Sequence, residues 1–185
     1  MSKQNTVIVD IYNHVQEKNR HPFIMLVGLP ASGKSTFVKS CQEVFGVGYA
    51  NVISTDDYFQ THADNNGVTY QQAFKEVSFD VAERAMWDDF KYSLGKNEPM
   101  IVDRTNLSIK SRSKFLTHLR GLEYIYTNIA VVFNPDEETR KKQSDYRFKD
   151  TGKIVPSGIV DSMRCHYQFP TKEEGFDKIF SVSYS

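Results

Sequence analysis

The chain has 185 residues, 39% of them apolar and 13% aromatic, and its 23 Lys and Arg residues balance 23 Asp and Glu residues to a formal net charge of zero at pH 7. This composition excludes a disordered chain, which lacks the apolar and aromatic content for a core. Zero net charge argues against a protein that coats nucleic acid non-specifically. The length indicates one domain over residues 1–185.

Short β-rich runs alternate along the chain with stretches of helical period. Strands are predicted over residues 23–27, 51–54, 100–103, 125–133 and 178–182. Helices are predicted over residues 6–18, 35–44, 70–94, 109–120, 136–148 and 157–167. Such alternation is typical of βαβ units, so we expect an α/β fold with helices on both faces of a mostly parallel sheet. The expected parts are an N-terminal helix (6–18), a core (22–135), and a lid with a closing segment (136–185).

Cysteine content and apolar run length bear on the compartment. The two cysteines, Cys41 and Cys165, lie in predicted helices and make no disulfide framework. The longest apolar runs are far shorter than the roughly 20 residues that span a bilayer. Asp10 and His14 interrupt any apolar core of a signal peptide. We therefore expect a reduced, cytoplasmic setting and no membrane partner, while the pattern favours no particular oligomeric state.

A glycine-rich loop follows the first predicted strand. Residues 28–35 read Gly-Leu-Pro-Ala-Ser-Gly-Lys-Ser, the G-x-x-x-x-G-K-S pattern of a phosphate-binding loop (P-loop). In such loops backbone N–H groups point at phosphate oxygens, so Lys34 can reach the β- and γ-phosphates and the Ser35 hydroxyl is placed for Mg²⁺. The predicted nucleotide-binding residues are Gly28, Pro30, Ala31, Ser32, Gly33, Lys34, Ser35 and Thr36. We expect ATP and Mg²⁺ as cofactors, although no motif distinguishes adenine from guanine. We also expect a three-layer α/β/α fold of P-loop kinase type.

Carboxylates follow the second and third predicted strands. Asp56 and Asp57 come after the second strand and Asp103 after the third, and ligands of a doubly wound sheet bind at the carboxyl ends of its strands. A carboxylate there can accept a proton from an attacking hydroxyl, hold Mg²⁺ through water, or fix an acceptor. Spacing from the strand favours Asp56 over Asp57 as the catalytic base. The alternative for each aspartate is a helix cap or a turn.

The stretch 136–156 is dense in basic residues. Arg147 stands apart from the run at 140–142 and precedes a predicted break at 150–152. Phosphoryl transfer spreads negative charge over the transferring group, and an arginine from a mobile segment stabilises that charge. Arg147 is therefore predicted to be catalytic and to contact the nucleotide. The run at 140–142 is interpreted as a solvated helix face.

Together these residues resemble the 5′-polynucleotide kinase family, the phosphoryl-transfer domain of phage and DNA-repair end-healing enzymes. The resemblance covers roughly residues 23–182 and rests on the P-loop, on Asp56-Asp57-Tyr58, on Asp103-Arg104-Thr105-Asn106 with the Ser111-Arg112 helix, and on closing motifs at 155–156, 160–163, 167–171 and 174–176. It implies that Asp56 deprotonates the 5′-hydroxyl of a nucleic acid, that Arg147 contacts the triphosphate, and that Asp103, Thr105 and the Val155-Pro156 stretch line the acceptor site. The predicted acceptor residues are then Asp56, Asp57, Phe59, Asp103, Arg104, Thr105, Val155 and Pro156.

Two positions depart from that family's pattern. Phage members carry an arginine three residues after the first acid of the Asp-Asp-Tyr motif, where this chain has Phe59, and several members carry a second lid arginine where this chain has Gln143. Both changes remove a contact to an anion. Phe59 could stack on a base or belong to the core, and Arg104, Lys110 and Arg112 are candidates to replace the missing phosphate contacts.

Three functions fit these observations. The first is an ATP-dependent kinase that phosphorylates the 5′-hydroxyl end of DNA or RNA. The second is a P-loop kinase for a small hydroxylated acceptor such as a nucleoside or sugar, which the two departures favour and the closing motifs disfavour. The third is an ATP-dependent binding module without phosphotransfer. A nucleic-acid acceptor predicts binding that weakens steeply with salt, and a small neutral acceptor does not.

Overall fold

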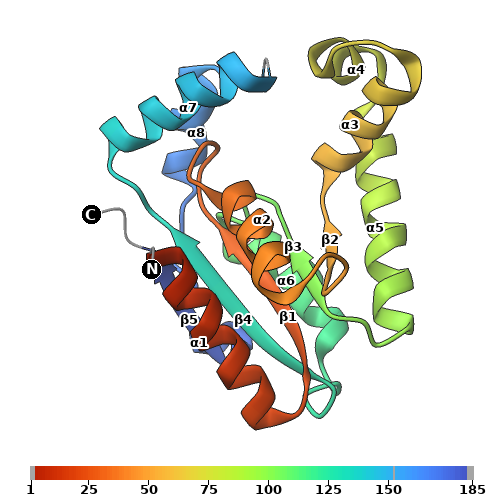
Figure 1. The fold of residues 1–185 in the computed structure, drawn as a ribbon, viewed down its shortest axis with the longest axis vertical. Coiled ribbons are helices and arrows are strands. Elements are labelled where there is room, and N and C mark those ends of the chain that lie inside the picture. Colours follow the sequence, from red (N-terminus) through yellow and green to blue (C-terminus); the bar gives the residue numbers. More distant parts are fainter. Residues whose placement is uncertain (1–2, 152, 183–185) are drawn as a thin grey trace.

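The computed structural model describes residues 3–151 and 153–182, whose strands form one parallel sheet in the order β2-β3-β1-β4-β5 (Figure 1). The strands are β1 (His21–Val27), β2 (Asn51–Ile53), β3 (Met100–Val102), β4 (Tyr126–Phe133) and β5 (Lys178–Val182). The predicted α/β class is confirmed. Helices connect each strand to the next strand in the chain, and every strand pair is parallel, so all carboxyl ends lie at one edge of the sheet.

The helices cover both faces of this sheet in three layers. They are α1 (Lys3–Lys18), α2 (Lys34–Phe45), α3 (Thr55–Asn66), α4 (Tyr70–Glu76), α5 (Phe79–Gly95), α6 (Ile109–Leu119), α7 (Glu137–Thr151) and α8 (Ser157–Cys165), with a 3₁₀ turn at Lys172–Glu174. One cluster of buried apolar side chains joins α1 and α2 to one face, and a second joins α5 and α6 to the other. None of the described helices is long and apolar enough to cross a membrane.

Strand β1 shows how the sequence fixes the layers. It is buried over Pro22–Val27, as a central strand of a parallel sheet requires. Successive side chains point to opposite faces, so Phe23 and Met25 pack with α5 and α6, whereas Ile24 and Leu26 pack with α1 and α2. The same alternation sets the register in which Ile24 lies opposite Ile101 on one side and Ile129 on the other.

The stretch between β2 and β3 differs from the prediction. One helix was expected over 70–94, but there are two, because Val77 and Ser78 have extended backbone angles that end α4 and begin α5. Helix α3 was not predicted, since its sequence is mostly polar and few apolar side chains mark a face. Ser54 caps its start, and Gly67, at φ 64° in the left-handed region, ends it.

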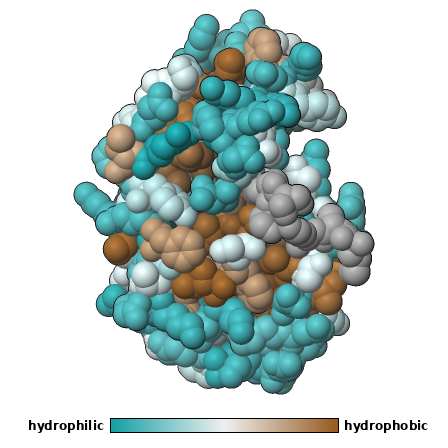
Figure 2. Space-filling model, turned by 90° about the vertical axis from the view of Figure 1, so that its left-hand side faces the viewer, coloured by the Kyte–Doolittle hydropathy of each residue, from teal (hydrophilic) through white to brown (hydrophobic). Residues whose placement is uncertain are grey.

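At the carboxyl end of the sheet, the chain rises on two sides above the loop between β1 and α2. Helices α3 and α4 rise on one side, and α7 and α8 on the other (Figure 1). On the face that carries α1 and β5, apolar residues gather across the middle and hydrophilic residues lie above and below them (Figure 2).

A buried ion pair anchors the loop that follows β3. Arg112 is fully buried, and its guanidinium donates to both carboxylate oxygens of Glu174 at 2.7 and 2.8 Å. It also donates to the backbone carbonyls of Gln168 and Asn106 at 2.8 and 3.0 Å. The Asn106 amide reaches Leu26 O at 2.8 Å. Arg112 thus joins α6, the closing segment and the end of β3 to the central strand.

Candidate active site

The P-loop, residues 28–36, runs from the end of β1 into α2. The Gly28 N–H donates to Thr105 O at 3.0 Å, and a Cβ at Gly28 would lie only 2.7 Å from Phe133 O. Ala31 and Gly33 have φ values of 57° and 91°, the left-handed conformation that glycine adopts without strain. These turns aim the N-terminal end of α2 at the carboxyl edge of the sheet, as phosphate binding requires.

Lys34 is the buried cation of this loop. Its ammonium donates to Gly28 O at 2.9 Å and to Leu29 O at 2.8 Å. Burial lowers the pKa of Lys34 from 10.5 to about 8, and the Asp103 carboxylate opposes that change. Lys34 therefore loses its proton more easily than an exposed lysine does. A bound anion would raise the pKa of Lys34 again, because a nearby negative charge favours the charged amine.

Asp103 lies against the start of α2. The Ser35 hydroxyl donates to Asp103 Oδ2 at 3.4 Å, and burial raises the pKa of Asp103, while Lys34 opposes the rise. The prediction assigned Asp103 to the acceptor, whereas its observed contact is with Ser35. A hydroxyl and a carboxylate side by side are the hard oxygen ligands that Mg²⁺ prefers, so the residues present fit this ion. Thr36 is exposed in the first turn of α2.

Asp56 occupies the first turn of α3 with its carboxylate turned toward other elements. The cap of α3 is Ser54, whose Oγ accepts the Asp56 N–H at 3.1 Å, so Asp56 does not act as the cap. Asp56 Oδ1 accepts the Tyr70 hydroxyl of α4 at 3.0 Å. Asp56 Oδ2 accepts a hydrogen bond from Nη2 of Arg147 in α7 at 3.2 Å. The two residues predicted to be the base and the mobile arginine thus meet directly.

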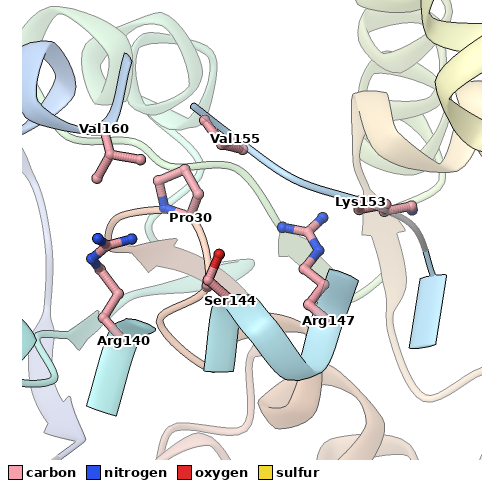
Figure 3. Close-up of a pocket in the computed structure, with 8 residues that line it drawn as sticks. Pro30, Arg140, Ser144, Arg147, Lys153, Val155 and Val160 are labelled. Carbon is pink, nitrogen blue, oxygen red and sulfur yellow. The ribbon is translucent and has the colours of Figure 1, made fainter. Parts of the chain in front are cut away.

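Residues of α7, of α8 and of the stretch between them surround a small pocket beside the P-loop (Figure 3). The pocket is lined by Pro30, Ala31, Arg140, Ser144, Arg147, Lys153, Val155 and Val160. Arg147 and Lys153 lie on the side of the pocket away from Arg140 and Val160 (Figure 3). Arg140, interpreted as part of a solvated face, is instead buried and paired with Glu137. Of the predicted break at 150–152, Gly152 lies outside the described residues.

The remaining acceptor predictions have mixed outcomes. Of the two alternatives for Phe59, the core position is confirmed and base stacking is wrong, because the residue is 1% exposed and its ring packs against Phe74 and Phe79. Arg112 is likewise unavailable, since it is fully buried with Glu174. Arg104 pairs with Glu83 at 3.2 Å.

Other predicted acceptor residues stay near the site without an assigned contact. Asp57 is exposed in the first turn of α3, and desolvation raises its pKa to about 6, with Asp103 and Asp56 adding repulsion. Thr105 is half-buried and bonds to the P-loop through its carbonyl. Pro156 is exposed at the start of α8.

Two residues beside Asp56 were not predicted from the sequence. Tyr70 donates to its carboxylate, and the Lys153 ammonium lies 3.8 Å from the centre of the Tyr70 ring. The signal that could have found Tyr70 is Thr69-x-x-Gln72, a capping box that starts a helix at this residue. Lys153 carried no comparable signal, because only the fold brings it to α4.

Comparison with known proteins places the chain in a family. A family model described as an AAA domain matches residues 23–170. The chain belongs to this AAA domain family. The matched part of this AAA domain runs from β1 through the P-loop, α3 and α7 to the closing segment. It supports a P-loop kinase-type enzyme that binds a nucleotide.

One curated relative is a bifunctional polynucleotide phosphatase/kinase of Schizosaccharomyces pombe. It is 25% identical over 172 residues, which make up 92% of this AAA domain chain and 36% of the relative. This chain therefore spans about a third of that protein.

Solved structures share the fold at lower identity. A structure from Chloroflexus aurantiacus described as a kinase has a TM-score of 0.62 at 15% identity, covering 88% of this chain and 84% of the other. Kti12 of Chaetomium thermophilum, in complex with ADP-AlF3, has a TM-score of 0.57 at 13% identity and covers 87% and 88%. These likenesses confirm the three-layer P-loop kinase architecture.

Proposed function

We propose that this AAA domain transfers the γ-phosphate of ATP to the 5′-hydroxyl end of DNA or RNA. The observation that carries the proposal is the Asp56 carboxylate held 3.2 Å from Arg147 and 3.0 Å from Tyr70, at the same edge of the sheet as Lys34. A base, a lid cation and a phosphate loop are the parts that phosphoryl transfer needs. The polynucleotide acceptor is supported by the name of the curated relative.

In the proposed reaction, the acceptor oxygen forms a bond to the γ-phosphorus while the bond to the β,γ-bridging oxygen breaks and ADP leaves. Asp56 accepts the proton of the attacking hydroxyl. Lys34 and Arg147 neutralise negative charge on the transferring group, for which Arg147 exchanges the Asp56 carboxylate for phosphate oxygens. The Arg147 side chain is 31% exposed, so part of it is accessible for this exchange.

The nucleotide and the metal have separate supports in the proposal. Residues 28–36 would cradle the triphosphate through backbone N–H groups and the Lys34 ammonium. Ser35 and Asp103, 3.4 Å apart, would hold Mg²⁺. When bound, this ion supplies positive charge to the phosphate oxygens. Acceptor contacts are proposed for Asp57, Arg104, Thr105 and the Val155-Pro156 stretch.

The test is transfer of labelled γ-phosphate from ATP with Mg²⁺ to a 5′-hydroxyl oligonucleotide. Asp56→Asn keeps the size of the side chain and removes the base, so we expect the rate to fall by about 10²- to 10⁴-fold. The matched control is Asp64→Asn, in the same helix, where an exposed carboxylate bonds only to Gln60 in the described contacts. Equal rates for Asp56→Asn and wild type would refute the proposed base.

A second candidate function is a kinase for a small hydroxylated acceptor. Phe59 and Arg112 are both buried, which removes two positions expected to contact the acceptor chain, and this observation favours a smaller acceptor. Mixed nucleosides in the same assay distinguish the two. Label on a nucleoside alone, with a rate that is insensitive to salt, would replace the polynucleotide proposal. ATP binding with no labelled acceptor would favour a binding module.

A further inference from the structure

The first turn of α4 places a tyrosine against the proposed base. Thr69 and Gln72 form a capping box in which Thr69 Oγ1 accepts the Gln72 N–H at 3.2 Å and Gln72 Oε1 accepts the Thr69 N–H at 2.8 Å. The box fixes Tyr70 as the first residue of the helix. Tyr70 is half-buried, and its hydroxyl donates to Asp56 Oδ1 at 3.0 Å.

Neighbouring side chains hold the Tyr70 ring. Phe59 meets it edge-on, with ring centroids 6.1 Å apart and an interplanar angle of 73°. Phe74 lies nearly parallel to it at 6.3 Å, and the Lys153 ammonium is 3.8 Å from its centre. Aromatic and cation–π contacts of this kind orient a ring. Phe59 therefore has an identified position in the site, although it is too deeply buried to touch an acceptor.

The hydroxyl of Tyr70 is a donor at neutral pH. Burial raises the pKa of Tyr70, and the charge of Asp56 and the hydrogen bond to it raise the pKa further. A tyrosine that keeps its proton can only donate to a carboxylate. Tyr70 is therefore the donor in the contact with Asp56 Oδ1.

The two oxygens of Asp56 have different partners. Tyr70 holds Oδ1, and Arg147 holds Oδ2. In the proposed reaction Arg147 leaves for the phosphates, which frees Oδ2 to accept the proton of the attacking hydroxyl. Without a second donor the carboxylate would then rotate about its Cβ–Cγ bond, and a base that is misaligned with the hydroxyl is a poor base.

We propose that Tyr70 is a positioning residue: its hydroxyl fixes the rotation of the Asp56 carboxylate so that Oδ2 faces the acceptor hydroxyl, and Phe59 and Lys153 hold the ring that carries it. This inference rests on the proposed role of Asp56 as the base. No contact of Tyr70 with substrate is required.

Tyr70→Phe tests this, because it keeps the ring and its packing and removes only the hydroxyl. We expect kcat to fall by about ten- to hundredfold, while KM for ATP, KM for the 5′-hydroxyl oligonucleotide and the melting temperature stay near the wild-type values. The matched control is Tyr92→Phe, a tyrosine that is 65% exposed on α5, which leaves all four quantities unchanged.

A double variant separates positioning from a direct role. If Tyr70 acts only through Asp56, Asp56→Asn with Tyr70→Phe transfers phosphate as slowly as Asp56→Asn alone. A double variant slower than Asp56→Asn would overturn the inference. So would a kcat of Tyr70→Phe within twofold of wild type, or a kcat loss matched by a fall in melting temperature. Full activity of Asp56→Asn would instead refute the proposed base.

Discussion

The two sides of the site are built differently. The phosphate side, residues 28–36, is one continuous stretch between β1 and α2, and Ser32 and Lys34 are 1% and 9% exposed. The acceptor side consists of separate segments that meet through their side chains: the starts of α3 and α4, the end of α7 and residues 153–156. It is also more exposed, since the Arg147 and Asp56 side chains are 31% and 47% exposed. Changes on the phosphate side should therefore affect stability and binding together. Changes on the acceptor side should affect rate and leave stability nearly intact.

Arg112 lies on the acceptor side but is buried, so its loss should affect stability strongly. It supports the acceptor side from within the core, where its guanidinium has no exposure and bonds to Glu174 and backbone carbonyls. Arg112→Met leaves the Glu174 carboxylate buried without its partner, so we expect the free energy of unfolding to fall by about 3–5 kcal/mol. Urea denaturation followed by circular dichroism measures this.

The matched control is Lys114→Met, an exposed cation on the same helix, which should change stability by less than about 0.5 kcal/mol. Equal stability of Arg112→Met and wild type would contradict an anchoring role for the buried ion pair.

Gly28→Ala tests the phosphate side. The added Cβ would lie 2.7 Å from both Phe133 O and Ser32 Oγ, so the loop must shift. We expect a loss of about 1–3 kcal/mol in stability together with weaker ATP binding. Gly158→Ala is the control, because a Cβ there meets nothing within 4 Å. Thermal unfolding and calorimetric titration with ATP measure both effects, and unchanged binding in Gly28→Ala would show that the loop is not tightly packed.

These contrasts explain what the sequence could and could not predict. The P-loop was readable because its residues are neighbours in the chain and each has a local backbone requirement. The Asp56 site could be predicted only in part, because its members are distant in the sequence: Arg147 lies 91 residues from Asp56 and Tyr70 lies 14 residues from it. Phe59 was ambiguous because α3 is mostly polar; once the helix is known, burial of Phe59 and Ala63 marks its inner face. A buried arginine such as Arg112 contradicts the usual exposure of its residue type.

Arg147→Ala tests whether the acceptor side affects rate without affecting stability. An ion pair this exposed contributes less than about 1 kcal/mol to stability, so the melting temperature should barely change. Loss of the lid cation should lower the rate of phosphoryl transfer by about ten- to hundredfold. Lys142→Ala, an exposed lysine paired with Glu138 on the same helix, is the control. A large loss of stability with an unchanged rate would show that Arg147 has a structural role and does not stabilise the transferring group.

On the phosphate side, pH should change ATP binding and stability in opposite directions through Lys34. Because burial lowers the pKa of Lys34 from 10.5 to about 8, the unfolded chain binds more protons than the folded one between these values. Stability without nucleotide should therefore rise with pH over this window through Lys34. ATP affinity should fall over the same window, by up to about tenfold per pH unit, since the neutral amine cannot pair with phosphate.

Comparison of wild type with Lys34→Met at pH 7.5, 8.5 and 9.0 isolates this group, because other residues titrate in both proteins. The difference in unfolding free energy and the difference in ATP affinity should change in opposite directions as the pH rises. Titration in buffers of different ionisation enthalpy should also detect proton uptake on ATP binding near pH 8.5 in the wild type and not in Lys34→Met. If both differences stayed flat with pH, Lys34 would keep its proton throughout, and its burial would not be limiting the charge that the P-loop offers to phosphate.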